Sequence, residues 1–270
     1  MEIKGQENLI KEVSKVFEIF KATDGHIKPH FILTGPSGSG KSLTIATLCK
    51  KHDINFLEVN AAQITKEGTS GNSLSKVLAP LSNRSNTLNI VFVDEFDKLF
   101  ISGNSNDSSA HESTTGVQNE FLKLLEGNTA SVFGDYGKYN LISIKKTLFI
   151  FAGAFNNEEN ISIDRLREIG VKTEFIGRVG LIFNTNQLTF EDLISILKNS
   201  PLLENYLHLF KNVSKNSAID EISSKMGEMY ELNTLGARMI NTLIHQYFIK
   251  GGLKEEESKK ITFQKQLSFN

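Results

Sequence analysis

Two short segments of the sequence carry the side chains that could do chemistry. The first covers residues 35–42, whose letters GPSGSGKS fit the pattern G-x-x-x-x-G-K-[ST]. It follows an apolar run that predicts a strand over 30–34, and it opens a predicted helix over 41–51. In such a loop, successive backbone N–H groups and the helix N-terminus bind a polyphosphate, and side chains bulkier than glycine would block its approach. The segment therefore predicts a nucleotide-phosphate site.

Each residue of this loop has an expected role. Lys41 would neutralise the β- and γ-phosphates, and Ser42 would ligate Mg²⁺. A glycine-rich turn that matches the pattern by accident is the alternative, and the flanking strand and helix argue against it. The predicted nucleotide-binding residues of the loop are Gly35, Pro36, Ser37, Gly38, Ser39, Gly40, Lys41, Ser42 and Leu43.

The second segment is an apolar run over residues 89–94 that ends in two adjacent carboxylates, Asp94 and Glu95. A strand of this kind places an acid at the carboxyl edge of a parallel sheet, beside a bound nucleotide. We expect Asp94 to hold Mg²⁺ through its water shell and Glu95 to polarise the attacking water as a general base. Without other motifs, this carboxylate pair is equally typical of solvated turn residues and of a catalytic site. The phosphate loop upstream favours catalysis of NTP hydrolysis.

Length and composition limit the function classes. At about 150 residues per domain, 270 residues predict one large or two modest domains. Thirty Lys and Arg against 31 Asp and Glu disfavour a dedicated nucleic-acid binder. The single cysteine, Cys49, excludes an internal disulfide and a CxxC zinc knuckle. The N-terminus lacks a signal-peptide pattern and no apolar run approaches the ~20 residues of a membrane span. We therefore expect a soluble, cytoplasmic protein without a membrane partner.

The elements that must position these residues alternate along the first two thirds of the chain. Apolar residues at helical spacing predict an amphipathic helix over 6–20. Strands alternating with helices predict an α/β fold with a mostly parallel sheet that is covered on both faces. The short apolar runs that predict strands are residues 30–34, 55–59, 89–94, 147–152 and 181–184.

The stretch after the carboxylate pair is polar over residues 102–109, which predicts a surface loop. Thr115 and Gln118 then have the spacing of a capping box. We expect a helix that begins there and runs to Glu126, with Gly127 as its stop.

Past residue 186 the pattern becomes helical, which places a domain boundary between a large domain, 1–186, and a small one, 187–270. The expected helices of the small domain cover 191–198, 201–210, 218–229 and 235–249, followed by a strand over 260–263.

Further segments appear in a characteristic order. They are Gly5-Gln6-Glu7, Asp94-Glu95-Phe96-Asp97-Lys98, Gly116-Val117-Gln118, Leu122-Lys123-Leu124-Leu125-Glu126-Gly127, Phe149-Ile150-Phe151-Ala152-Gly153-Ala154-Phe155, Glu174-Phe175-Ile176-Gly177-Arg178 and Gly236-Ala237-Arg238. In this order they closely resemble the AAA+ module of the ClpX protein-unfoldase family, from about residue 3 to residue 263.

The resemblance implies a P-loop NTPase fold: a parallel five-stranded αβα sandwich followed by a small, mostly helical lid domain, with ATP and Mg²⁺ between them. It also implies that copies of the chain assemble into a hexameric ring that acts on a protein client. In this mapping Arg178 is similar to the arginine finger that reaches the γ-phosphate bound by a neighbouring subunit. Arg238 is similar to the sensor-2 arginine, and Ile3 aligns with the part that lines the adenine pocket. Surface ion pairs for the arginines, and a buried N-terminal anchor for Ile3, are the alternatives.

The sequence departs from the family at the loop that grips polypeptide in the central pore. The family has a Gly-aromatic-hydrophobic-Gly loop, and the matching residues here are Gly68, Thr69, Ser70 and Gly71. Two small hydroxyl side chains lose most of the contact area for a mechanical grip. The segment 133–139 contains aromatic residues and reads equally well as a second pore loop or as a β-hairpin with cross-strand aromatics.

Other features of the family are expected to be absent. One cysteine cannot support the zinc-binding N-terminal domain that receives adaptors. The peptidase-docking loop with its Ile-Gly-Phe tripeptide has no counterpart, because only residues 156–165 separate the strand ending near Phe155 from the next helix. The family's sensor-1 position, at the end of the strand predicted over 147–152, is left unassigned, because no polar side chain follows this strand before Asn156.

These observations lead to one leading hypothesis and two others. The leading hypothesis is a ClpX-like ATPase that hydrolyses ATP at inter-subunit sites to remodel or unfold a protein partner, without docking a peptidase. The second keeps the ATPase but makes it a nucleotide-controlled switch or assembly scaffold in a larger machine, which the small pore-loop residues favour. A nucleic-acid motor is disfavoured by the balanced charge.

Overall fold

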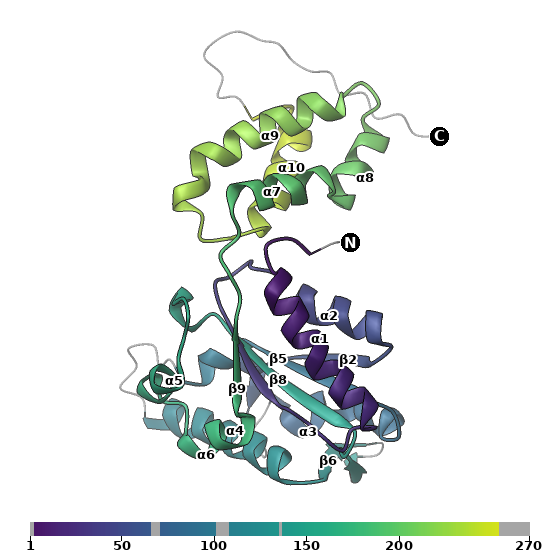
Figure 1. The fold of residues 1–270 in the computed structure, drawn as a ribbon, viewed down its shortest axis with the longest axis vertical. Coiled ribbons are helices and arrows are strands. Elements are labelled where there is room, and N and C mark those ends of the chain that lie inside the picture. Colours follow the sequence, from purple (N-terminus) through teal and green to yellow (C-terminus); the bar gives the residue numbers. More distant parts are fainter. Residues whose placement is uncertain (1–2, 66–70, 101–107, 135–136, 254–270) are drawn as a thin grey trace. The chain divides into compact units, whose positions relative to one another are not determined.

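The computed structural model describes residues 3–65, 71–100, 108–134 and 137–253 (Figure 1). The chain divides into two compact units. The sheet unit comprises residues 7–36 and 41–185, and the helical unit comprises residues 1–6, 37–40 and 186–270. Four residues of the predicted phosphate loop therefore belong to the helical unit.

The sheet unit is built on five parallel strands in the order β2-β5-β8-β1-β9, which confirms the predicted α/β fold and five-stranded sheet (Figure 1). Their bounds lie within one residue of those predicted, because each strand is a short apolar run that ends at a polar or glycine residue. The strands are β1 (Phe31–Thr34), β2 (Asn55–Asn60), β5 (Asn89–Asp94), β8 (Thr147–Gly153) and β9 (Leu181–Asn184).

Strand register brings polar residues together at the carboxyl edge of the sheet. Asn60 pairs with Asp94, and Thr34 pairs with both Gly153 and Asn184. All five strands end at this edge because they are parallel. The predicted catalytic carboxylates at the end of β5 therefore lie at the same edge as the end of β1, which leads into the phosphate loop, with β8 between the two strands.

Both faces of the sheet are buried, as the alternation of side chains in a strand requires. On one face Phe31, Leu33 and Phe92 pack against α1 (Glu7–Ala22) and α2 (Lys41–His52). On the other face Ile32, Val91, Val93 and Phe151 join a second apolar cluster. The helices that contribute to this second cluster are α3 (Leu74–Val77), α4 (Ser108–Glu126), α5 (Ile163–Ile169) and α6 (Thr173–Val179). The αβα layering is confirmed.

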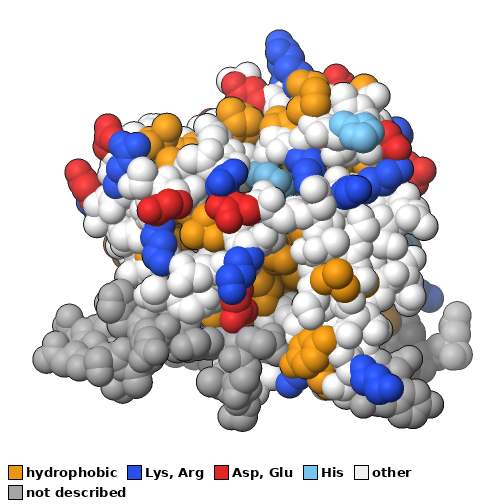
Figure 2. Space-filling view, turned by 90° about the horizontal axis from the view of Figure 1, so that it is seen from below, with side chains coloured by type: hydrophobic (Ala, Val, Ile, Leu, Met, Phe, Trp, Pro, Cys, Tyr) orange, Lys and Arg blue, Asp and Glu red, His pale blue; other side chains and the backbone are white. Residues whose placement is uncertain are grey.

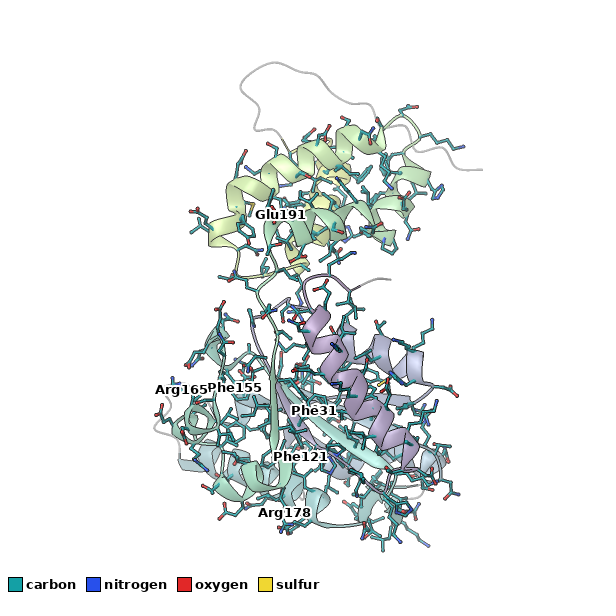
Figure 3. All side chains as sticks on the ribbon, viewed as in Figure 1. Phe31, Phe121, Phe155, Arg165, Arg178 and Glu191 are labelled. Atoms are coloured by element: carbon teal, nitrogen blue, oxygen red, sulfur yellow. The ribbon has the colours of Figure 1, made fainter. Side chains whose placement is uncertain are left out.

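Phenylalanines fill the second cluster next to β5 and the residues that follow it. Phe96 is fully buried, and its ring centroid lies 4.7 Å from that of Phe151 and 4.9 Å from that of Phe175. Phe121 of α4 joins the group at 5.5 Å from Phe151 (labelled in Figure 3). These contacts fix the backbone that follows Asp94 and Glu95, and they give the many Phe residues of this tryptophan-free chain a structural role.

The predicted start of α4 was wrong. The helix begins at Ser108 instead of Thr115, so residues 108–109 belong to it and not to a loop, and Thr115 lies inside it. The predicted start rested on the capping-box spacing of Thr115 and Gln118 and on the apolar stripe that follows it, and the residues ahead of Thr115 carry no such stripe. The end at Glu126 is confirmed, with the Gly127 N–H donating to Lys123 O at 2.9 Å. Residues 101–107 lie outside the described part of the chain.

The helical unit has its own apolar core, which confirms a mostly helical C-terminal part. Its first two helices match the prediction to within a residue, whereas α9 begins three residues earlier and α10 three residues later than predicted. The predicted strand over 260–263 lies outside the described residues. The helices are α7 (Phe190–Lys198), α8 (Pro201–Leu209), α9 (Lys215–Met229) and α10 (Arg238–Lys250).

The surface agrees with the balanced composition. Figure 2 shows Lys and Arg interspersed with Asp and Glu on one face, where neither sign of charge forms a continuous field. Within the described residues, no helix is both long enough and apolar enough to cross a membrane.

Candidate active site

The phosphate loop closes around the side chain of its lysine. Lys41, the first residue of α2, is only 9% exposed, and its Nζ donates to Gly35 O at 2.6 Å and to Pro36 O at 2.9 Å. The ammonium group therefore lies inside the curve of the loop, where a polyphosphate would meet it. Leu43, the third residue of the same helix, is 46% exposed.

Two glycines of the loop cannot be replaced without a clash. Gly35 has φ +133°, and a Cβ there would lie 1.9 Å from Thr185 Oγ1. Gly38 has φ +72°, and a Cβ there would lie 2.0 Å from Leu235 O. Both positions therefore combine a left-handed backbone with a close approach of other chain segments, and only glycine meets both conditions. The glycine pattern reflects packing of the loop as well as access for phosphate.

The two predicted metal ligands lie together. Ser42 Oγ donates to Asp94 Oδ2 at 3.4 Å, across the gap between α2 and the end of β5. Asp94 Oδ1 accepts from the Glu95 N–H at 2.9 Å, and Glu95 has φ +54°. The hydroxyl and carboxylate oxygens are hard ligands of the kind that Mg²⁺ prefers. The donor set therefore fits a nucleotide-bound magnesium ion.

The turn after β8 contains residues whose part in the site the sequence did not reveal. Phe155, Asn156 and Asn157 all have positive φ, at 44°, 60° and 59°. Asp97, which is 1% exposed, accepts from the Phe155 N–H at 3.2 Å. The Asp-Glu-Phe-Asp-Lys motif that follows β5 is thus bonded to the turn that follows β8. Asn156 is exposed and carries no demonstrated role.

Within the helical unit, Arg238 lies at the phosphate loop. Arg238, the first residue of α10, donates Nη1 to Ser37 Oγ at 3.3 Å, and the Ala237 N–H donates to Gly38 O at 3.1 Å. The structure therefore brings the predicted sensor-2 arginine to residues 37–40. Ile3 is half-buried in the same unit.

Gln6 also contacts the loop, although the sequence marked it only as part of a motif. It is 1% exposed, its Nε2 donates to Asn186 O at 2.8 Å, and its Oε1 accepts from the Asn186 N–H at 3.0 Å. A longer bond of 3.4 Å joins its Nε2 to Ser39 O. The buried amide of Gln6 thus ties the N-terminal segment to the loop.

Arg178 is not brought to the phosphate loop of its own chain. It lies in the last turn of α6, just before β9 begins, and therefore at the amino edge of the parallel sheet. Figure 3 shows it well apart from Phe155, which follows the carboxyl end of β8. Its guanidinium, 53% exposed, pairs with Glu126 at 3.0 Å. The alternative of a surface ion pair is thus present, and the position also suits contact with another molecule.

The first predicted pore loop lies mostly outside the described residues, since 66–70 are not described. The residues on either side of the loop are joined, however, because β3 (Ile64–Thr65) pairs in parallel with β4 (Asn72–Ser73). Gly71 has φ +135°, and a Cβ there would lie 2.8 Å from the Thr65 side chain. The glycine is required by this close approach.

The segment 133–139, of which residues 135–136 are not described, is flanked by two paired strands, since β6 (Thr129–Phe133) pairs antiparallel with β7 (Tyr139–Ser143). The rings of Phe133 and Tyr139 lie directly across, 5.7 Å apart and nearly perpendicular. This is the cross-strand aromatic pair of the hairpin alternative. A role for the segment 133–139 as a second pore loop stays a prediction.

Comparison with known proteins agrees with this geometry. The chain is 28% identical to the ATP-dependent Clp protease ATP-binding subunit ClpX of Treponema denticola, over 90% of this chain and 69% of the relative. It is 29% identical to ClpX 2 of Wolinella succinogenes, over 81% and 64%, and 26% identical to ClpX of Borrelia duttonii, over 81% and 61%. The chain thus spans about two thirds of the length of these relatives.

The model of the family described as "ATPase family associated with various cellular activities (AAA)" matches residues 31–175, just over half of the 270 residues. This match runs from β1, through the phosphate loop and the Asp94-Glu95 pair, to α6. The chain belongs to the AAA family of ATPases, and ATP hydrolysis is the activity that this membership indicates.

Proposed function

We propose that the chain is a ClpX-like ATPase module that hydrolyses ATP at sites shared between neighbouring copies and uses the cycle to remodel or unfold a protein partner. The observation that carries the proposal is the separation of two sets of residues. Lys41, Ser42, Asp94 and Glu95 gather at the carboxyl edge of the sheet, whereas Arg178 lies beyond its amino edge.

In the proposed reaction, the residues of one copy bind and orient the substrate. The loop N–H groups and Lys41 hold the phosphates, and Glu95 accepts a hydrogen bond from the attacking water. A magnesium ion, held by Ser42 and by Asp94 through water, would neutralise charge on the β- and γ-phosphate oxygens. Ile3 and Leu43 would contact the nucleoside end, and Arg238 would contact the phosphates.

Arg178 supplies the second half of the site in this proposal. An arginine that stabilises developing charge on the γ-phosphate can contribute about 10³–10⁵ in rate. Since its own phosphate loop lies at the other edge of the sheet, Arg178 would serve a neighbouring copy. Repetition of this contact closes a ring, and the resemblance to the ClpX family implies six subunits.

We also propose a functional division into a nucleotide-binding domain, 1–186, and a lid domain, 187–270. The chain leaves the sheet after Asn184, and every regular element from Phe190 to Lys250 in the described residues is helical.

Independence from a peptidase is part of the proposal. The segment between β8 and α5 is short, and hydrogen bonds and an ion pair fix its conformation. Phe155 N–H bonds to Asp97, Arg165 forms a two-point ion pair with Glu158 at 2.6 Å, and Ile161 N–H bonds to Asn184 at 2.9 Å. This leaves no extended loop at the place where the family carries its peptidase-docking tripeptide.

The alternative is a nucleotide-controlled switch or assembly scaffold. It is favoured by Thr69 and Ser70, whose small side chains offer a polypeptide little contact area. A hydrolytic Glu95 and a trans-acting Arg178 would be of less use to a static scaffold, so the remodelling function is preferred.

ATP hydrolysis by purified variants tests the catalytic assignment. We expect Glu95→Gln and Arg178→Ala to lose at least about 100-fold in kcat while still binding nucleotide. Arg167→Ala is the matched control, because Arg167 is a similarly exposed arginine in an ion pair, with Asp164 at 2.7 Å. Full activity in both test variants would contradict the assignment, and equal loss in the control would show a general surface effect.

Unfolding of a fluorescent protein that carries an unstructured tag separates the two purposes. A remodeller should quench the fluorescence in the presence of ATP, with no peptidase added and no quenching by Glu95→Gln. Robust ATPase activity without quenching would instead favour the switch or scaffold. Stimulation of the ATPase by DNA but not by unfolded protein would contradict both.

A further inference from the structure

One side chain at the carboxyl edge joins the phosphate-loop strand to the turn after β8. Asn184 is the last residue of β9 and lies directly beside Thr34, the last residue of β1. Its Oδ1 accepts a hydrogen bond from Thr34 Oγ1 and a second, at 2.9 Å, from the Ile161 N–H. The orientation of the amide is fixed, because a backbone N–H can only donate and must face the oxygen.

The first partner, Thr34, leads directly into the phosphate loop. Thr34 is fully buried and precedes Gly35. Its carbonyl accepts from the Thr185 N–H at 2.8 Å and from Thr185 Oγ1 at 3.2 Å. Thr185 also leaves no room for a Cβ on Gly35. The start of the loop is therefore held by the two residues that end β9 and follow it.

The second partner, Ile161, ends the strained turn after β8. Ile161 is 4% exposed and directly precedes Ser162, which caps α5. The turn begins at Phe155, whose N–H is bonded to the buried Asp97 of the catalytic segment. A displacement of Asn184 would therefore disturb both the strand that leads into the phosphate loop and the turn after β8.

This turn occupies the place of sensor 1, yet β8 brings no polar side chain to it. The strand ends with Ala152 and Gly153, and Ala154 follows it. Asn184 on β9, the strand beside β1, is a shared acceptor and offers another route by which the state of the phosphate loop can reach the turn.

We propose that Asn184 is a positioning residue that couples nucleotide binding at the phosphate loop to the turn at residues 155–161. The proposal rests on the function proposed above, since it requires nucleotide at residues 35–42. Asn184 acts through Thr34 and Ile161, and it sets the alignment of the turn for hydrolysis more than the affinity for ATP.

The test uses the full chain and three variants. Asn184→Ala removes the shared acceptor, and Asn184→Asp keeps an acceptor oxygen at the same position. Asn55→Ala is the matched control, because Asn55 begins the other edge strand, β2, and its Nδ2 donates to Thr87 Oγ1 at 2.8 Å and to Leu88 O at 3.2 Å. It lies at the amino edge, away from the phosphate loop.

Hydrogen exchange of the peptide 155–165 is measured with and without a slowly hydrolysed ATP analogue. In the unmodified chain the analogue should slow exchange of this peptide by about threefold or more. Asn184→Ala should lose this response and about tenfold in kcat, with KM and analogue affinity within about threefold. Asn184→Asp and Asn55→Ala should keep the response.

The proposal fails if the analogue binds and the peptide does not respond in the unmodified chain, or if Asn184→Ala responds normally. It also fails if Asn55→Ala loses the response to the same extent. If Asn184→Ala does not fold, Thr34→Val, which removes one buried hydroxyl and keeps the shape, should lose the response. A chain that binds no nucleotide contradicts the proposed function and this inference together, which distinguishes that outcome from failure of the inference alone.

Discussion

His30 should make the stability of the sheet unit depend on pH. The imidazole is 7% exposed, and its Nδ1 accepts from the Phe149 N–H at 2.9 Å. Burial lowers the pKa of His30 to about 4, from 6.5, and the charge of Lys28 adds to the decrease. The folded protein therefore keeps the ring neutral under conditions in which the unfolded chain protonates it.

The sign and size of the effect follow from these values. Between pH 6.5 and about 4 the unfolded state binds a proton that the folded state does not, so the free energy of unfolding falls as the pH is lowered. The stabilisation is present in full above the unfolded pKa. A shift of 6.5 − 4 = 2.5 units at ~1.36 kcal/mol each corresponds to about 3 kcal/mol lost by the acid end of this window.

Urea unfolding followed by circular dichroism suits a chain without tryptophan. His30→Asn places an amide oxygen near the position of Nδ1, so it should keep the bond from Phe149 and remove the titration. Near pH 7 we expect the variant to lie within about 1 kcal/mol of the unmodified chain. Near pH 4.5 the unmodified chain should have lost about 2–3 kcal/mol more than the variant.

Other groups also titrate in this range, and the difference between the two chains cancels their contribution. His26→Asn is the control, because His26 is exposed in the same unit, and its curve should follow the unmodified chain. Parallel pH curves for the unmodified chain and His30→Asn would refute the argument. They would mean that the ring is solvated or protonated in the folded protein.

Three further outcomes are expected. Gly35→Ala should lower the melting temperature and abolish nucleotide binding, because its Cβ would lie 1.9 Å from Thr185 Oγ1. Gly177→Ala is the control: a Cβ at Gly177 would meet open space, so this variant should melt no lower than the unmodified chain. Burial raises the pKa of Cys49 to about 12, so a thiol reagent near neutral pH should label the chain only in denaturant, and rapid labelling of the folded chain would contradict this. Phe96→Ala should cost about 3–5 kcal/mol in urea unfolding, since the ring contacts Phe100, Phe151 and Phe175, and a loss under 1 kcal/mol would refute its central place in the core.

The local parts of the site were predictable because their chemistry is contiguous in sequence. The phosphate loop and the Asp94-Glu95 pair each lie on one short segment, and each follows a strand whose apolar run is unambiguous. Parallel strands then bring both segments to the same edge without any further information. The pairing of Ser42 with Asp94 follows from that edge alone.

Contacts that join distant segments were not predictable in this way. The Thr34 and Asn184 side chains are separated by 150 residues, and neither belongs to a motif. Gln6 belongs to a motif, but its contact with Asn186, in which one buried amide satisfies a backbone N–H and C=O at a separation of 180, is equally distant in sequence. A single sequence contains no signal for such pairs, because an asparagine at a strand end is also a common solvated residue.

Helix boundaries failed for a related reason. The capping-box spacing of Thr115 and Gln118 and the apolar stripe after it predict a start at Thr115, but α4 begins seven residues earlier, at Ser108. Helices α5 and α6 are seven residues each, too short for periodicity to define. Their limits depend on caps instead, and Ser162 and Gly170 bound α5 through bonds that only the fold reveals.

The backbone strain at the carboxyl edge supports a functional reading of the turn after β8. Left-handed residues other than glycine cost about 1–3 kcal/mol each and persist only where the surroundings over-determine them. Three such residues occur in a row at 155–157, and Glu95 is a fourth at the end of the neighbouring strand. Three side chains bind this turn: Asp97 and Asn184 accept from backbone N–H groups at its two ends, and Arg165 pairs with Glu158 between them. A turn that served only to connect β8 with α5 could relax at little cost, so the anchors imply that its exact shape matters for what happens beside Glu95.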